Sequence, residues 1–262
     1  MEVTVLGCSG SMASGHHTTS FLVDQTVLID AGSGVGTLSV EAMQRIDHVL
    51  LSHSHLDHVL ALPLLADVVM RHRIENRRGP IEVHALAATL EVLREHLFNN
   101  RLWPDFTRLP TPQAPAIRLH PIEVGQTLDL GHIKAQVLPA RHVVPGVGFA
   151  VWDGRHRDSS IWGYSGDTGP NPEVWPILAG LPRLRHWVIE VAFSDADRDL
   201  ARVSGHHCPA TLDPEIDGLP SEVQVHLTHL KPGKWDAVQA DLLHRAWNRP
   251  LHMLSHGQRF VL

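Results

Sequence analysis

The feature that most constrains the fold is a group of polar side chains between two apolar runs, in the stretch HVLLSHSHLDHVLALPLLADVV. The run before the group, IDHVLLS, has the composition of a buried strand. Residues 57–73, which follow it, repeat apolar side chains at helical spacing. The polar group therefore lies on a strand-to-helix turn, a place where many α/β proteins carry functional side chains.

Three histidines and one aspartate occupy this turn. His53 and His55 are two residues apart, so on an extended segment they point the same way, and Asp57 and His58 follow at the start of the helix. Imidazole and carboxylate together suit Zn²⁺, and also Mn²⁺ or Fe²⁺. The pattern predicts two pairs of ligands for two adjacent divalent cations. The alternative, that all four are solvated loop residues, requires the motif to arise by chance between apolar runs.

Three later residues have ligand chemistry at the ends of predicted strands. His142 follows a strand at 133–139, Asp167 lies in the tight turn SGDTG, and His229 ends a strand at 222–228. Each alone is equally well explained as a turn former or a capped histidine. Together with the turn at 53–58 they complete a set of five imidazoles and two carboxylates.

The rest of the chain predicts one α/β domain over residues 1–262. Strands are expected at 147–153, 160–164 and 186–191, and helices at 35–45, 87–98, 173–180, 209–216 and 235–247. Strands with interleaved helices occur twice over, which indicates an αβ/βα sandwich of two halves with helices outside and sheets inside. Residues 99–116 are irregular and rich in proline, which predicts a long excursion loop near the site.

Composition restricts the classes of partner. The formal net charge is −6, which disfavours an extended nucleic-acid surface, and the one basic run, RHRIENRR, reads as a solvated helix end. No apolar run is long enough to span a membrane, no signal peptide is evident, and two cysteines indicate a reduced, cytoplasmic protein. Most of the 21 histidines must be ordinary surface or packing residues. We expect this of His48, His84, His120, His186 and His226.

The order HSHLDH, lone histidine, SGDTG and THLKP resembles the metallo-β-lactamase superfamily along nearly the whole chain. That resemblance implies a four-layer αβ/βα sandwich with a dinuclear site between the sheets. It implies that His53, His55 and His142 hold one metal, and that Asp167 bridges to the second. The ligands implied for the second metal are Asp57, His58 and His229.

Three stretches are most similar to class II cyclic-nucleotide phosphodiesterases: LREHLFNNRLWPDF, YSGDTGP with HLTHLKPG, and IEVAFSDAD followed by SGHHCPATL. The chain departs from that family at Ala61, where glycine is usual. The resemblance implies that Glu190 and His206 lie beside the metals. RNase Z has a comparable pair of glutamate and histidine. The resemblance also implies that Trp103 and Phe106 stack on a nucleobase. The equally good alternative is that both rings fill a hydrophobic gap under the loop.

These resemblances imply hydrolysis of a small phosphodiester such as cAMP or cGMP. Two metals would acidify a bridging water and neutralise charge on the phosphoryl oxygens. Asp57 would orient or deprotonate that water, His206 would contact the phosphate or protonate the leaving group, and Glu190 would orient His206. A homodimer is expected because such relatives commonly form one. An RNase Z-like nuclease, a lactam, thioester or lactone hydrolase, and a non-catalytic metal or nucleotide sensor are the alternatives.

Overall fold

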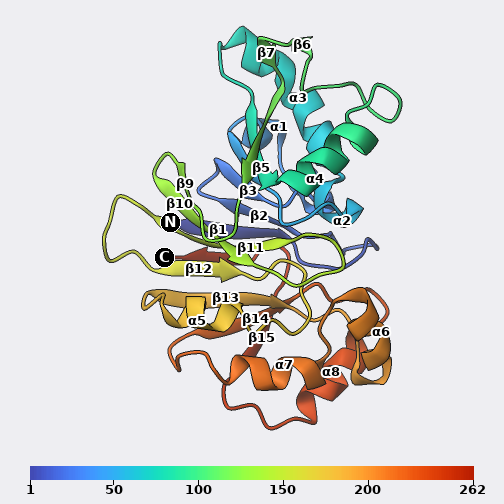
Figure 1. Ribbon diagram of the computed structural model, residues 1–262, viewed down its shortest axis with the longest axis vertical. Helices are drawn as coiled ribbons and strands as arrows, with labels where there is room; N and C mark the ends of the chain where they lie inside the picture. Colours follow the sequence, from blue (N-terminus) through green and yellow to red (C-terminus); the bar gives the residue numbers. More distant parts are fainter.

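The computed structural model describes residues 1–262 as two mixed sheets packed face to face, with helices on both outer faces (Figure 1). Each sheet has seven strands. The first sheet has the order β16 (Arg259–Val261), β1 (Glu2–Gly7), β2 (Ser20–Val23), β3 (Val27–Ile29), β4 (His48–Leu50), β5 (Ile81–Leu86) and β8 (Ile117–Ile122). The second has the order β15 (Leu251–Met253), β14 (Gln224–Thr228), β13 (Leu184–Glu190), β12 (Ile161–Tyr164), β11 (Val147–Asp153), β10 (Ile133–Pro139) and β9 (Thr127–Leu130).

Both sheets combine an antiparallel part with a parallel part. Strands β3, β4, β5 and β8 run parallel in the first sheet, and β12, β13, β14 and β15 run parallel in the second. Parallel neighbours end at the same sheet edge, so the loops that leave them are collected there. The loops after β4, β12 and β14 carry six of the seven residues predicted to bind metal, and the seventh, His142, follows β10.

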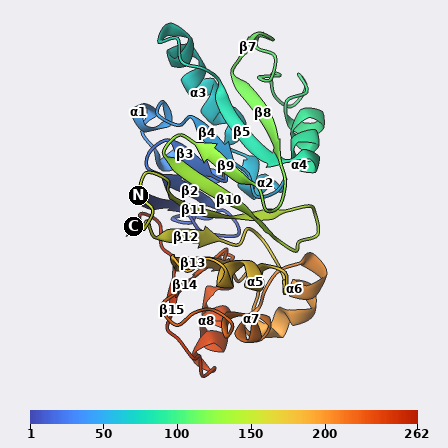
Figure 2. The same ribbon diagram turned by 60° about the vertical axis from the view of Figure 1, so that its left-hand side comes forward.

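Three layers of apolar side chains account for the four-layer arrangement. The middle layer joins the two sheets, and Val5 and Phe21 of the first sheet share it with Phe149 and Trp162 of the second. One outer layer lies under α1 (Val40–Met43), α3 (Leu62–Glu75) and α4 (Ala87–Val92). The other lies under α5 (Val174–Ala179), α7 (Pro209–Ile216) and α8 (Trp235–Leu243), at the opposite end of the molecule (Figure 2). The predicted αβ/βα sandwich is confirmed.

Several elements differ from their predicted bounds. The helix expected at 57–73 is two helices, α2 (Leu56–Val59) and α3, separated at Leu60 and Ala61. The helix expected at 35–45 is a 3₁₀ turn (Ser33–Thr37) followed by α1, and α4 continues into a π turn (Leu93–Leu97). The excursion loop contains a small hairpin, β6 (Pro110–Thr111) and β7 (Ala114–Pro115). Helix α6 (Arg198–Ser204) and the strands β8, β9, β15 and β16 were not predicted. None of the helices combines the length and apolar character that a membrane crossing requires.

Two rows of three histidines cross neighbouring strands, one row on each sheet. In the first, His48 Nδ1 lies 3.3 Å from His84 Nε2, and the His84 ring stacks on His120. In the second, His186 Nδ1 lies 3.1 Å from His226 Nε2, and the ring centroids of His226 and His252 are 5.2 Å apart. These histidines pack against one another within the sheets, as expected for five of them.

The two central histidines make the fold sensitive to acid. Burial and the neighbouring histidines lower the pKa of both His84 and His226 to about 3. An unfolded histidine titrates near 6.5, so between pH 6.5 and 3 the unfolded chain binds protons that the folded chain does not. We therefore expect the free energy of unfolding to fall as the pH falls through this range. The slope should reach about 1.4 kcal/mol per pH unit for each such histidine.

The measurement is urea unfolding at several pH values between 7 and 4, with His226→Gln compared with the parent chain. The variant should show a shallower loss of stability with acid, while an exposed-site control, His96→Gln, should keep the parent slope because its ring is 72% exposed. Equal slopes for the parent and His226→Gln would contradict the assignment.

Candidate metal centre

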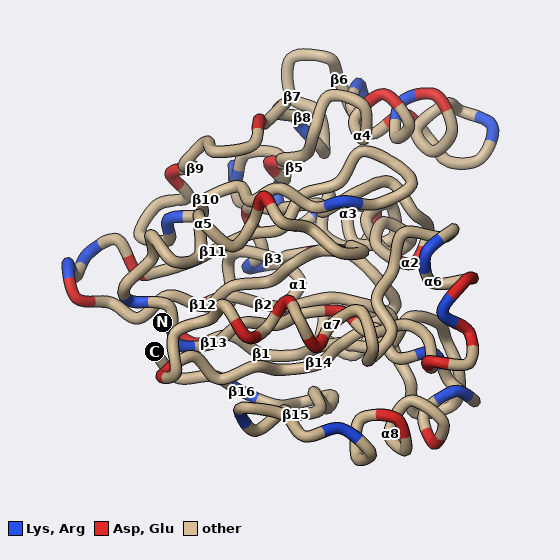
Figure 3. Tube along the Cα trace, turned by 60° about the horizontal axis from the view of Figure 1, so that its bottom comes forward, with Lys and Arg blue, Asp and Glu red and all other residues tan.

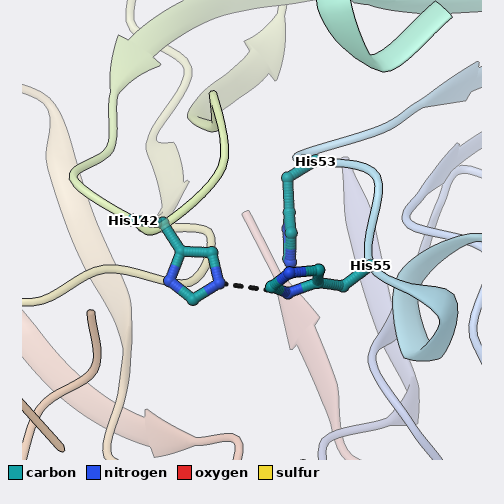
Figure 4. A group of neighbouring side chains, drawn as sticks. All are labelled: His53, His55 and His142. Atoms are coloured by element: carbon teal, nitrogen blue, oxygen red, sulfur yellow. Dashed lines mark hydrogen bonds between the residues drawn. The ribbon is translucent and has the colours of Figure 1, made fainter. Parts of the chain in front are cut away.

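The loops at one edge of the sandwich bring the predicted ligands together from both sheets. His53 and His55 follow β4 of the first sheet, while His142, Asp167 and His229 follow β10, β12 and β14 of the second. Figure 4 shows the rings of His53, His55 and His142 converging from two separate loops. Nε2 of His142 lies 3.1 Å from Nδ1 of His55. Residues far apart in the sequence thus form one cluster.

The cluster divides into groups whose donor atoms lie within 4.8 Å of one another. The first group is His53, His55 and His142, and the second is Asp57, His58, Asp167 and His229. A third group, His142, Asp167 and His206, overlaps the other two. The first two groups match the division that the resemblance implied, and the third adds His206 as a further potential donor.

Asp167 lies between the groups. Its Oδ2 is 3.3 Å from Nε2 of His58, 3.3 Å from Nε2 of His229 and 3.8 Å from Nε2 of His53. Its side chain is 2% exposed, whereas that of Asp57 is 29% exposed. The buried carboxylate thus lies between histidines of both groups, and Asp57 is the more solvent-accessible of the two carboxylates.

Outer hydrogen bonds orient the histidine rings. Nδ1 of His53 pairs with Ser52 Oγ at 3.0 Å, and Nδ1 of His142 pairs with the carbonyl of Gly205 at 2.9 Å. Nδ1 of His58 pairs with Asp30 Oδ2 at 2.8 Å. Occupying Nδ1 in this way leaves Nε2 for the interior of the cluster, as is usual for metal-bound histidine.

The residues present fit divalent cations. Several inward atoms are buried without any hydrogen-bond partner: His53 Nε2, His58 Nε2 and Asp167 Oδ1. A buried polar atom without a partner costs free energy, and a bound cation would satisfy all three. Neutral imidazole with carboxylate is the donor set that Zn²⁺, Mn²⁺ and Fe²⁺ accept.

The protonation of the cluster also indicates a demand for positive charge. Burial holds the pKa of His53 well below its ordinary value, so its imidazole is neutral and able to coordinate. Burial also opposes charge on His58, but Asp167 and Asp30 outweigh it and raise the pKa of His58 well above its ordinary value. A cation held by His58 and Asp167 takes the place of that proton.

Glu190 and His206 form a buried pair at the edge of the cluster. Glu190 Oε1 lies 2.7 Å from His206 Nδ1, and the His206 ring stacks on the ring of His229. Burial opposes protonation of His206, but the charge and hydrogen bond of Glu190 raise the pKa of the imidazole. Glu190 also accepts a hydrogen bond from the backbone of Thr168, one residue after Asp167. The pair is therefore fixed relative to the cluster.

The stacking role predicted for Phe106 requires correction. Phe106 is 3% exposed and belongs to the apolar layer under α3 and α4, where its ring faces Phe98. Trp103 is partly buried and packs against the same layer. These two rings anchor the loop. Their placement agrees with the alternative expectation, that they fill the apolar space under the loop.

Sequence reasoning missed Asp30. Its carboxylate is fully buried and accepts hydrogen bonds from the Ser52 backbone at 2.7 Å, from Ser52 Oγ at 2.8 Å and from Tyr164 at 3.2 Å, besides its contact with His58. Asp30 and His229 both adopt left-handed backbone conformations, with φ of 56° and 66°. Such strain outside glycine often accompanies function. The stretch LIDAG gave one signal, an aspartate directly after an apolar strand.

Comparisons with known proteins agree with this centre. Residues 25–255 match the family model described as the Beta-lactamase superfamily domain. A ribonuclease Z of Bradyrhizobium sp. (strain ORS 278) is 32% identical over 170 residues, which cover 62% of this chain and about half, 48%, of that protein. A probable 3',5'-cyclic-nucleotide phosphodiesterase of Yersinia pestis is 26% identical over 282 residues, covering 88% of this chain and 78% of that protein.

A solved structure shows the same fold over the whole chain. Unliganded yeast PDE1 superposes with a TM-score of 0.84 at 17% identity, covering 100% of this chain and 99% of that one. The family model spans most of the chain and includes all seven predicted ligands. The chain therefore belongs to the beta-lactamase superfamily, a family of hydrolases.

Proposed function

We propose that the protein is a metal-dependent phosphodiesterase with two divalent cations, Zn²⁺ before Mn²⁺ or Fe²⁺. The observation that carries the proposal is the pair of ligand groups on either side of the buried Asp167 carboxylate. His53, His55 and His142 would hold one cation. Asp57, His58 and His229 would hold the other, and Asp167 would contact both. When bound, such cations acidify a water and neutralise negative charge on a phosphoryl group.

Asp57 orients the attacking water. It is the more exposed carboxylate of the cluster, and its Oδ2 lies 3.4 Å from His58 Nε2 and 3.9 Å from His229 Nε2. Burial raises its pKa, but the hydrogen bond and charge of His58 outweigh this and lower it, so the carboxylate stays ionised at neutral pH. An ionised acceptor at the open side of the cluster can take a proton from water.

His206 supplies the proton to the leaving alkoxide. Its Nδ1 faces Glu190, so the proton available to substrate is on Nε2, and the raised pKa keeps the ring protonated more of the time. Glu190 is a positioning residue, because it contacts His206 and the backbone of Thr168. Since His206 shares a donor group with His142 and Asp167, coordination is the competing role.

A 3',5'-cyclic nucleotide is the substrate we propose to test first. Two relatives that each align with 88% of this chain are named as cyclic-nucleotide phosphodiesterases, a probable one from Yersinia pestis and one from Aliivibrio fischeri. An RNase Z-like activity is the second candidate, supported by the 32% identity to a ribonuclease Z. The net charge of −6 favours the small substrate over an RNA. Homodimer formation stays a prediction, which light scattering tests.

A substrate panel tests the proposal directly. Protein loaded with Zn²⁺ or Mn²⁺ is offered bis(p-nitrophenyl) phosphate, cAMP, cGMP and a tRNA precursor. We expect turnover of the aryl diester and of at least one cyclic nucleotide, with no cleavage of the tRNA precursor. Cleavage of the tRNA precursor alone would favour the second candidate, and hydrolysis of lactams but of no diester would exclude both.

His55→Ala should abolish hydrolysis with little loss of fold. The side chain belongs to the first ligand group and is half-buried, so its removal deletes a donor without emptying a core position. The measurements are metal content per chain, circular dichroism and turnover of bis(p-nitrophenyl) phosphate. His96→Ala is the matched control, because that exposed ring is far from any ligand group in sequence. Near-full activity of His55→Ala would contradict the proposed centre.

His206→Ala should lower kcat by about 10²–10⁴ with metal content unchanged, because it removes the proton donor and not a ligand. Glu190→Ala should lower kcat by about 10–100-fold, and Glu190→Gln by less, since an amide oxygen still accepts from Nδ1. KM should change little in each variant.

Metal analysis of the same variants separates the two roles of His206. Loss of metal in His206→Ala would make that residue a ligand. Equal losses of kcat in Glu190→Gln and Glu190→Ala would show that the hydrogen bond to His206 is not the operative contact.

A further inference from the structure

A pocket opens beside the candidate metal centre. It has a volume of about 460 Å³, and His142 and His206 form part of its wall. Both histidines belong to the ligand groups described above, and Gly205, which holds His142 through its carbonyl, also lines the pocket. A molecule bound at the centre can therefore extend into this space. The volume is within the range of small-ligand sites in proteins.

Three arginines line this pocket. Arg198 and Arg202 come from α6, four residues apart and thus on one face of the helix, and Arg141 comes from the loop after β10. Figure 3 shows both basic and acidic positions around α6. Asp199 is the only carboxylate of the lining; its side chain is fully exposed and its Oδ1 lies 4.0 Å from Arg202 Nε. In a chain of net charge −6, this pocket is locally basic.

Two of the three guanidinium groups have no partner in the fold, and the third, Arg202, has only the exposed Asp199 at 4.0 Å. The side chains of Arg141 and Arg198 make no hydrogen bond or ion pair, in contrast to Arg73, which bonds Asp47 and three backbone carbonyls. The backbone that carries Arg141 is nevertheless fixed, since its N–H donates to Thr168 Oγ1 at 3.0 Å and its carbonyl accepts from Gly169 at 2.9 Å. The backbone of Arg141 is thus fixed next to the Asp167 turn, and its exposed side chain is free to reach an anion.

The chemistry of the lining selects an anion. A guanidinium presents paired N–H donors that match the oxygens of phosphate or carboxylate. Val143 is the one hydrophobic residue of the lining, and the three arginines supply its cationic groups. We propose that this arginine pocket, Arg141, Arg198 and Arg202, binds a second phosphate group of the substrate while the scissile diester occupies the metal centre.

This inference rests on the proposed function and narrows its substrate class. The preferred substrates are small phosphodiesters that carry an additional phosphomonoester. A plain diester fills only the centre and leaves the three cations without an anion. If the arginines instead contacted successive phosphates of an RNA, one extra phosphate on a mononucleotide would not raise its affinity. The affinities of nucleotides with one and two phosphates therefore distinguish a phosphate subsite from an RNA-binding surface.

A binding experiment tests the pocket without any hydrolysis. The metal-loaded protein is titrated in a calorimeter with thymidine 3',5'-bisphosphate and with thymidine 5'-monophosphate. We expect the bisphosphate to bind at least about tenfold more tightly, the effect of one desolvated charge-assisted contact. In the double variant Arg198→Ala/Arg202→Ala this ratio should fall towards one. Arg71→Ala is the control, because that arginine is exposed on α3 and pairs with Glu75; it should keep the parent ratio.

Kinetics provide the second arm. The substrates are thymidine 5'-(p-nitrophenyl phosphate) and the same ester with a 3'-phosphate. The double variant should lose at least about tenfold more kcat/KM on the phosphorylated ester than on the plain one, with the difference mainly in KM. Equal affinity of the two nucleotides for the parent protein, or a ratio that the double variant leaves unchanged, overturns the pocket. Failure of the proposed function is distinct: no ester is hydrolysed, while the calorimetric ratio still decides the pocket.

Discussion

The buried carboxylate of Asp30 connects the parts on which the candidate centre depends. Asp30 directly follows β3 of the first sheet. Its carboxylate accepts hydrogen bonds from Ser52, which lies just after β4, and from Tyr164 of β12 in the second sheet. The same oxygen that meets Tyr164 meets His58 Nδ1. One charge thus joins two sheets and orients a ligand. Its cost of burial is offset only while these contacts persist, since a buried charge without partners is strongly destabilising.

The candidate centre therefore forms only when the two sheets pack against each other. The proposed ligands come from both sheets, and the rings of His53, His58 and His142 are fixed from outside by Ser52, Asp30 and Gly205. Fixing the rings before a cation arrives limits the conformational entropy lost on binding. Asp167 and Asp30 also favour positive charge beside them, as the raised pKa of His58 indicates.

The sequence predicted the sandwich and the ligand cluster because both follow from local patterns. Strands β10 and β11 and helix α7 have the predicted bounds, since each is a continuous run with clear ends. The proposed ligands stood out because histidine or aspartate directly after an apolar run is unusual. Asp30 was missed because its partners come from other strands, up to 134 positions away. The arginines of α6 were missed because that short helix has no apolar repeat, and its role appears only beside His142 and His206.

The assembly of one ligand group from distant parts of the chain has a consequence for biosynthesis. His229 completes the second ligand group, while Asp57 and His58 of the same group lie in the first quarter of the chain. A chain emerging from the ribosome carries the early ligands for several seconds or more before His229 exists, given synthesis at about 5–20 residues per second. During that interval the full donor set cannot form. If the protein binds the two cations proposed above, the second ligand group would be complete only after His229 has been synthesised.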